Sequence, residues 1–230
     1  MTIQEFQNIE AHMLYMMKDS AHDRHHIDRV LHFALEIAAT EAGVDLDVLV
    51  AACLLHDIGR EQQAKDPTRC HAQIGGEMAY KYLVQAGWSE EKAGHVKACV
   101  ASHRYRRDST QESLEAKILF DADKLDVTGA TGVARTLIYG GQISEPLYLM
   151  DQDGEIVVAG TDAEKSSFVQ EYHYKLKRLY AAFHTERARQ LAEERREHAE
   201  AFYHALHSEI ASNQAMGTQR LKALLTERES

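Results

Sequence analysis

Apolar residues recur at three- and four-residue intervals through most of this chain, and its only prolines are Pro67 and Pro146. That spacing places the apolar side chains on one face of an α-helix. Helices of this kind bury their apolar faces against one another. The sequence therefore predicts an all-α fold, a helical bundle whose helices lie over 26–41, 46–58, 71–86, 90–103 and 112–127.

Residues typical of helix ends support these boundaries. Asp45 and Ser89 stand just before two of the predicted helices, where a side-chain oxygen can accept a hydrogen bond from an otherwise unpaired backbone N–H. Gly87 follows the helix that begins at His71, and Gly59 follows the LLHDI stretch. Glycine is favoured just after a helix, so both positions are expected helix stops.

Segment 128–162 is rich in glycine, which predicts a loop rather than a helix. Asp153-Gly154 is typical of a tight turn between two short extended pieces. The expected feature is a short loop or hairpin insert at 140–162, with pieces at 147–150 and 155–159.

Helical periodicity returns over 163–213, with a break expected near His184–Thr185 because the run is long for one globular helix. We interpret the chain as a single domain, 1–230, with a core at 20–130 and a C-terminal helical extension. The amphipathic extension is expected to pack on its own domain, and its use by a partner helix or a homodimer stays open.

The net charge of −10 argues against binding to a nucleic-acid polymer, which needs a basic surface. Local arginines can still serve a small phosphorylated substrate. The N-terminal stretch has no signal-peptide pattern, and no apolar run reaches the roughly 18 residues of a membrane span. Three cysteines without a CxxC pair indicate reduced thiols. We therefore expect a cytoplasmic protein that does not enter membranes.

His56 and Asp57 follow an apolar helical face in LLHDIGR. An aspartate there is costly to bury unless it is paired or coordinated. His26 stands at the edge of the apolar stripe of the first predicted helix. Asp123 shares the buried face of Leu119, whereas Asp121 is expected to lie off that face. Two histidines and two carboxylates form a mixed nitrogen and oxygen ligand set. Such a set suits one divalent cation (Mn²⁺, Mg²⁺, Fe²⁺, Co²⁺, Ni²⁺ or Zn²⁺) better than a closed structural zinc site.

His71 and His103 are candidates to bind a second metal or a substrate phosphate. The structural alternatives are a surface histidine at a helix start and a histidine that complements a helix C-terminus. Lys124 can neutralise a phosphate or merely pair with a neighbour. The candidates for substrate contacts are Arg60, Arg104, Arg107 and Asp126. The arginines can clamp phosphates or form an exposed basic helix end, and Asp126 can instead orient a metal ligand.

His26, His56-Asp57 and Asp123 together resemble the signature of the HD superfamily of metal-dependent phosphohydrolases. The stretches HDRHHIDRV, AACLLHDIG and EAKILFDADKLDVTGATGVART are similar to the small bacterial HD hydrolases of the YedJ and YpgQ type. The resemblance implies an α-helical HD fold, a divalent metal, and phosphohydrolase chemistry. For YpgQ-like members it implies nucleoside triphosphates cut to monophosphate and pyrophosphate.

The expected reaction is attack of metal-bound water on phosphorus, with Asp57, His71, His103 and Lys124 as the catalytic candidates. Two alternatives stay open. One is a non-catalytic HD module that senses a nucleotide, and the other is a phosphomonoesterase or phosphodiesterase of the same superfamily.

Overall fold

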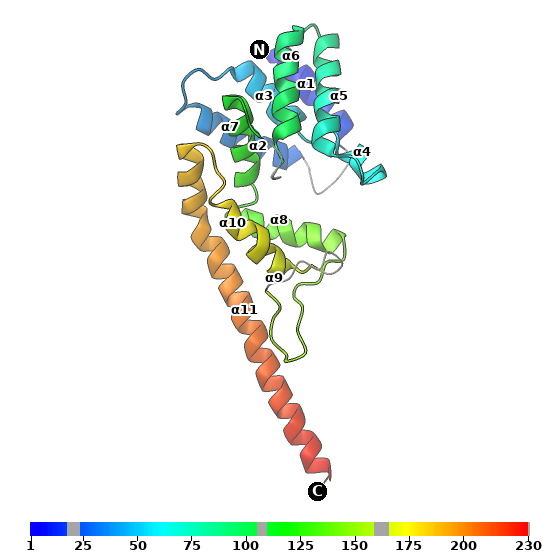
Figure 1. Ribbon diagram of the computed structural model, residues 1–230, viewed down its shortest axis with the longest axis vertical. Helices are drawn as coiled ribbons and strands as arrows, with labels where there is room; N and C mark the ends of the chain where they lie inside the picture. Colours follow the sequence, from blue (N-terminus) through cyan, green and yellow to red (C-terminus); the bar gives the residue numbers. More distant parts are fainter. Residues whose placement is uncertain (18–23, 105–109, 159–165, 230) are drawn as a thin grey trace. The chain divides into compact units, whose positions relative to one another are not determined.

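The computed structural model describes residues 1–17, 24–104, 110–158 and 166–229 (Figure 1). Within these residues the regular structure is helical, which confirms the predicted all-α fold. The chain divides into two compact units. Unit 1 comprises Met1–Asp126 with Ala182–Leu191, and unit 2 comprises Val127–Ala181 with Ala192–Ser230. None of the described helices is both long enough and apolar enough to cross a bilayer.

Unit 1 is built around one apolar helix. Its helices are α1 (Ile3–Met16), α2 (Arg24–Ala38), α3 (Leu46–Leu55), α4 (Arg60–Lys65), α5 (His71–Gln85), α6 (Glu90–Ser102) and α7 (Leu114–Leu125). The last eight residues of α3 are apolar and nearly all buried, and α3 contacts α1, α2, α5, α6 and α7. A helix that is apolar on every side belongs in the centre of a bundle. The C-terminal end of α3 therefore delivers the residues that follow it into the interior.

The predicted helix caps are confirmed. The Asp45 side chain accepts hydrogen bonds from the backbone nitrogens of Asp47 and Val48, and the Ser89 hydroxyl accepts one from Lys92. The helix predicted over 46–58 ends earlier, at Leu55, and a turn leads into α4. Helix α1 was not predicted.

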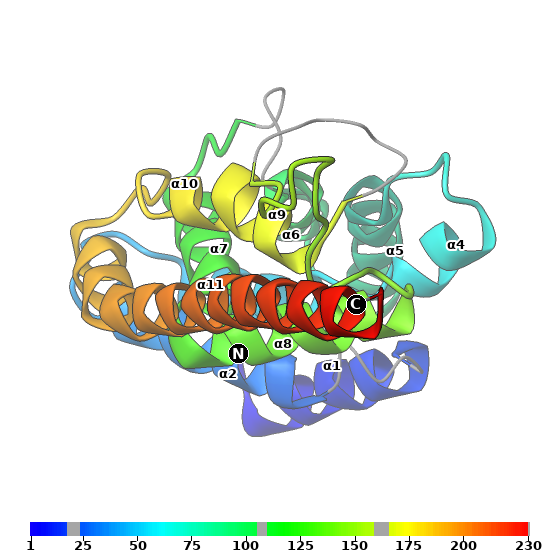
Figure 2. The ribbon, with the colours of Figure 1, turned by 90° about the horizontal axis from the view of Figure 1, so that it is seen from below.

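Unit 2 contains α8 (Gly129–Gln142), α9 (Phe168–Glu171), the π-helix η1 (Tyr172–Leu176) and α10 (Lys177–Leu179). Of helix α11 (Glu186–Glu229), the residues up to Leu191 belong to unit 1 and the rest to unit 2 (Figure 2). Rings stack in the core of this unit, with centroids 3.4 Å apart for Tyr172 and Tyr203 and 5.0 Å apart for Phe168 and Tyr203.

The prediction of a loop throughout 128–162 is wrong for its first part, which forms α8. Gly132 is a packing residue here, because a Cβ at this position would clash with the Val127 backbone and lie only 3.0 Å from its Cα. The hairpin itself is confirmed. Met150 and Ile156 form an antiparallel bridge, and Gly154 has a φ of 82°, which favours glycine at the turn.

The predicted break near His184–Thr185 is confirmed, since α10 ends at Leu179 and α11 begins at Glu186. Asp121 was expected to lie off the buried face of its helix, and that expectation is wrong. Its side chain is fully buried and accepts hydrogen bonds from the backbone nitrogens of His184 and Thr185. Those two N–H groups immediately precede α11 and need an acceptor, which explains the buried carboxylate.

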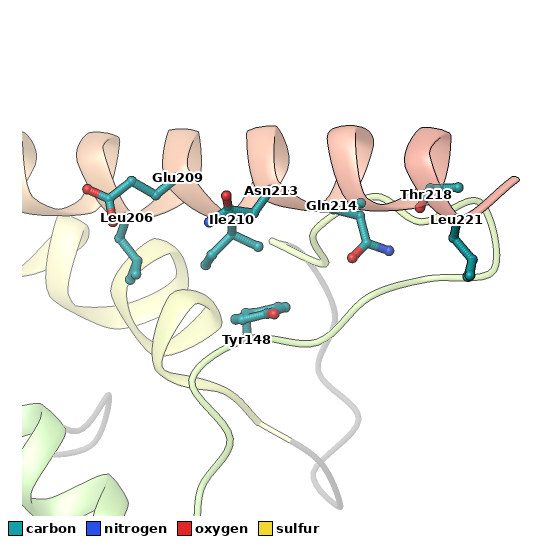
Figure 3. Close-up of a pocket in the computed structure, with 9 residues that line it drawn as sticks. Tyr148, Leu206, Glu209, Ile210, Asn213, Gln214, Thr218 and Leu221 are labelled. Carbon is teal, nitrogen blue, oxygen red and sulfur yellow. The ribbon is translucent and has the colours of Figure 1, made fainter. Parts of the chain in front are cut away.

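A groove of about 470 Å³ runs along α11 within unit 2, opposite Tyr148 (Figure 3). The described side chains that line it include neither histidine nor aspartate, so it offers no metal-ligand set. Its lining on α11 consists of Leu206, Glu209, Ile210, Asn213, Gln214, Gly217, Thr218 and Leu221.

Candidate metal centre

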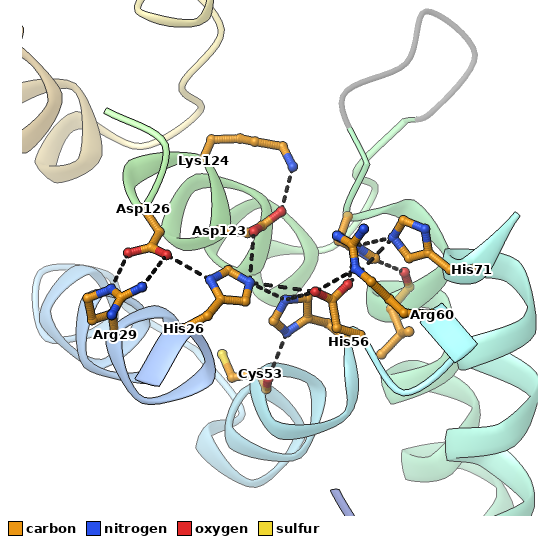
Figure 4. A network of polar contacts seen from close by, with 12 residues as sticks. His26, Arg29, Cys53, His56, Arg60, His71, Asp123, Lys124 and Asp126 are labelled. Atoms are coloured by element: carbon orange, nitrogen blue, oxygen red, sulfur yellow. Dashed lines mark hydrogen bonds and ion pairs between the residues drawn. The ribbon is translucent and has the colours of Figure 1, made fainter. Parts of the chain in front are cut away.

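Three helices of unit 1 bring the four predicted ligands together at the end of α3 (Figure 4). His26 comes from α2, His56 is the C-cap of α3, and Asp123 comes from α7. One ligand atom from each of these three lies within 4.8 Å of the other two. Asp57 Oδ2 lies 3.6 Å from Nε2 of both His26 and His56. All four side chains are buried.

A second group of potential ligands adjoins the first. Asp57 Oδ1 lies 3.5 Å from His71 Nε2 and 3.7 Å from His103 Nε2. These three residues also satisfy the 4.8 Å criterion and are buried. The two oxygens of Asp57 therefore face two different pairs of imidazoles.

The tautomer of each of the four imidazoles follows from its Nδ1 contact. Each Nδ1 lies 2.5–2.8 Å from an oxygen, and the acceptors are Asp126 Oδ2 for His26, the Cys53 carbonyl for His56, Gln63 Oε1 for His71 and the Val100 carbonyl for His103. Carbonyl and carboxylate oxygens accept hydrogen bonds, so the neutral rings carry their proton on Nδ1. Their Nε2 atoms then present lone pairs.

Those lone pairs face each other. The Nε2 atoms of His26 and His56 lie 3.2 Å apart, and those of His71 and His103 lie 3.4 Å apart. Two unprotonated nitrogens at this distance repel each other, and a cation placed between them and the nearby carboxylates removes the repulsion. The donor set thus fits a divalent metal ion, because neutral imidazoles and ionised carboxylates are the forms that bind metals.

Burial keeps His56, His71 and His103 neutral. It lowers the pKa of His56, it lowers the pKa of His103 to about 3, and together with the positive charge of Arg60 it lowers the pKa of His71 to about 2. Burial alone would raise the pKa of the Asp123 carboxyl, but Lys124 and the neighbouring histidines bring that pKa below its ordinary value. Near pH 7 the site therefore offers lone pairs and an ionised carboxylate.

Gly59 explains how the turn after α3 meets α5. A Cβ on Gly59 would clash with the backbone oxygen of His71 and would lie 2.7 Å from the backbone nitrogen of Gly75. Only glycine allows the HD turn and the start of α5 to approach this closely. The approach brings His71 to within reach of Asp57.

Charged side chains surround the ligands. Lys124 Nζ lies 2.5 Å from Asp123 Oδ2, and Arg60 Nε lies 2.9 Å from Asp57 Oδ2. The Arg104 guanidinium donates to Cys70 Sγ at 3.4 Å, beside His71. Arg107, the remaining predicted substrate contact, lies outside the described residues.

Asp126 lies behind His26 and is fully buried. Besides accepting from the His26 ring, it pairs with Arg29, whose Nε lies 2.5 Å from Asp126 Oδ1 and whose Nη2 lies 3.1 Å from Oδ2. This placement favours the role of orienting a ligand over direct contact with a substrate. Sequence reasoning missed Arg29 and Gln63. The position of Arg29, three residues after His26 on one helix face, was an available signal, whereas Gln63 had none.

A family model described as the HD domain matches residues 24–128, which include all four predicted ligands. Over 197 residues the chain is 32% identical to YpgQ of Bacillus subtilis, covering 84% of this chain and 86% of YpgQ. The crystal structure of B. subtilis YpgQ in complex with ADP is similar, with a TM-score of 0.67 and 29% identity over 89% of this chain and 97% of that one.

A predicted HD superfamily hydrolase from an uncultured Thermotogales bacterium has a structure with a TM-score of 0.58. It is 30% identical and the match covers 90% of this chain and 92% of that one. The sequence match to YpgQ spans most of both proteins, and the HD model falls on the segment that carries the histidine and aspartate cluster. This chain belongs to the HD-domain family.

Proposed function

We propose that this protein is a metal-dependent phosphohydrolase that acts on a nucleotide, with cleavage of a nucleoside triphosphate to monophosphate and pyrophosphate as its reaction. One observation carries the proposal: the buried Asp57 carboxylate faces the Nε2 atoms of two separate histidine pairs. Burying an ionised carboxylate among facing lone pairs is costly unless a charge partner or a bound cation compensates them. The nucleotide is suggested by the ADP complex of the relative YpgQ.

The residues offer two positions for divalent cations. The first would be held by His26, His56, Asp123 and Asp57, and the second by Asp57, His71 and His103. When bound, a divalent metal lowers the pKa of water and polarises a phosphoryl oxygen. Manganese suits this set of nitrogen and oxygen donors.

Cationic side chains next to these positions can neutralise the negative charge of substrate phosphates. Lys124 has three N–H donors, so it can keep its contact with Asp123 and also donate to a phosphate oxygen. Arg60 contacts Asp57 through Nε, which directs only one edge of its guanidinium to that carboxylate. Preorganised cations of this kind stabilise charge that develops on phosphate oxygens in the transition state. Arg104 and Arg107 remain predicted substrate contacts.

The test is to incubate the Mn²⁺-loaded protein with a panel of nucleotides and to identify the products by chromatography. Loss of a residue that only supports a metal ligand costs up to roughly 100-fold in activity. Asp57 is itself a proposed ligand, so Asp57→Asn should lower turnover by more than that. Asp153→Asn is the matched control, because Asp153 is exposed in the hairpin of unit 2 and should leave turnover unchanged.

Pyrophosphate as the product supports the proposed bond cleavage, whereas orthophosphate alone contradicts it and indicates a phosphatase. Thermal stabilisation by nucleotides without any product would instead indicate a sensing module. Unchanged turnover in folded, metal-replete Asp57→Asn overturns the assignment of the site.

A further inference from the structure

The two potential metal positions differ in their own ligands. Asp57 is shared, so the first position adds His26, His56 and the carboxylate of Asp123. The second adds only His71 and His103. Within the part of the chain that the structure describes, no second carboxylate joins this latter group. A divalent cation gains more from two carboxylates than from one, so the first position has the stronger ligand set.

The groups that accept the Nδ1 hydrogen of the histidines also favour metal binding at the first position. His26 donates its Nδ1 hydrogen to the buried carboxylate of Asp126. His71 donates to the neutral amide oxygen of Gln63, at 2.5 Å. A carboxylate acceptor makes an imidazole a stronger donor to a metal and fixes its orientation, and such partners are worth roughly 10- to 100-fold in metal affinity.

The surrounding charge separates the positions further. Beside the first, Lys124 is matched by Asp123 and Arg29 by Asp126. Beside the second, Arg104 and Arg60 both act electrostatically on His71, and Arg60 also pairs with the shared Asp57. Two guanidinium groups oppose a lone cation but favour a cation that arrives with an anion.

We propose that the two positions fill in order: the first binds a divalent cation in the free protein, and the second takes its cation together with a phosphate-bearing ligand. This inference rests on the proposed function in that both positions bind metal. It makes the second cation part of substrate recognition. A nucleoside phosphate that carries a bound cation is the ligand that this side of the site would select.

Ion counting at a fixed free Mn²⁺ concentration tests the order. The full chain is dialysed against buffered Mn²⁺, and protein-bound manganese is measured by atomic emission with and without ADP. We expect about one ion per chain without ADP and about two with it. Electron paramagnetic resonance should then show coupling between two manganese ions only in the ADP sample. Two ions without ADP, or one ion in both samples, overturns the proposal.

Paired variants test the cause. Gln63→Glu gives His71 the carboxylate partner that His26 already has, so the second ion should bind roughly tenfold more tightly and appear without ADP. Asp126→Asn should weaken the first ion by roughly 10- to 100-fold. His103→Ala should hold the count at one even with ADP, which excludes manganese carried by ADP bound elsewhere. A Gln63→Glu protein that is folded by circular dichroism but binds its second ion no more tightly contradicts this explanation.

These readouts do not depend on turnover. If no nucleotide is hydrolysed but the ions bind in the expected order, the proposed reaction fails and the order stands. If hydrolysis proceeds with both ions bound equally tightly, only the order fails.

Discussion

Asp121 Oδ2 lies 2.7 Å from both the backbone nitrogen and the hydroxyl oxygen of Thr185, which are its hydrogen-bond donors. The same carboxylate also accepts from the backbone nitrogen of His184. A single buried side chain on α7 therefore satisfies the donors that precede α11. The relationship lies wholly within unit 1 and ties its C-terminal segment, Ala182–Leu191, to its helical core.

Asp121→Ala should lower the free energy of unfolding by about 3 kcal/mol or more, because it leaves three donors without their acceptor, at about 1–3 kcal/mol each. Urea unfolding in the presence of a chelator measures this apart from any metal effect. Thr185→Ser keeps the hydroxyl and should cost less than about 1 kcal/mol. Equal stability of the Asp121→Ala and wild-type proteins would show that water replaces the carboxylate.

Gly59→Ala should destabilise the protein by about 1–3 kcal/mol or more, the usual cost of forcing extra atoms into a packed site. The added Cβ would meet the backbone of His71 and Gly75, which cannot move aside as a flexible side chain would. Displacement of His71 should also weaken binding of the second Mn²⁺, measured by calorimetry in the presence of ADP.

Gly94→Ala provides the control on a helix of the same unit. Gly94 lies inside α6, and a Cβ there meets nothing within 4 Å among the described atoms. This substitution should stabilise the protein by about 0.5–1 kcal/mol. A Gly59→Ala protein as stable as Gly94→Ala would contradict the close approach of the two backbones.

The parts of the fold that sequence reasoning predicted are those whose signal is local. Asp45 and Ser89 cap the helices that follow them because a side-chain cap needs only its own backbone neighbours. Gly132 shows the limit of such reasoning. From the sequence, a glycine at this position predicts a helix break. In the folded chain Gly132 instead lies inside α8, where the close approach of the Val127 backbone leaves no room for a Cβ.

In the candidate site, too, local features could be predicted from the sequence and long-range contacts could not. His26, His56-Asp57 and Asp123 could be selected because each stands at the edge of an apolar helical face or directly after one. That Asp57 divides its two oxygens between two histidine pairs depends on the relative placement of four chain segments. Asp121 was misjudged because its partners His184 and Thr185 lie more than 60 residues away in the sequence.

Cys70 should be the first cysteine modified by iodoacetamide. Partial burial alone would raise the pKa of its thiol, but the Arg104 guanidinium and the backbone N–H groups at the start of α5 bring it below the ordinary value of 9.0. The thiolate, which is the reactive form, therefore appears at a lower pH than in a free cysteine. Burial raises the pKa of Cys99 to about 12 and that of Cys53 further still, so both should react only after unfolding.

Peptide mass spectrometry after timed labelling at several pH values measures these rates. The labelling rate of Cys70 should reach half its maximum below pH 9, and Arg104→Gln should move that midpoint upward. Labelling of all three cysteines at one rate in the native protein would contradict the burial of Cys53 and Cys99.

Removal of metal should lower the melting temperature, because a cation that binds only the folded state adds stability according to its concentration and affinity. At 100 times its dissociation constant, Mn²⁺ contributes about 2.7 kcal/mol, which for a chain of this size corresponds to roughly 5–10 °C. Fluorescence-monitored unfolding with a chelator, and then with excess Mn²⁺, measures the shift. Asp123→Asn removes the carboxylate that only the first metal position uses, so it should lose most of the shift, whereas Asp153→Asn should keep it. An equal Mn²⁺-dependent shift in both variants would place the stabilising cation away from His26 and His56.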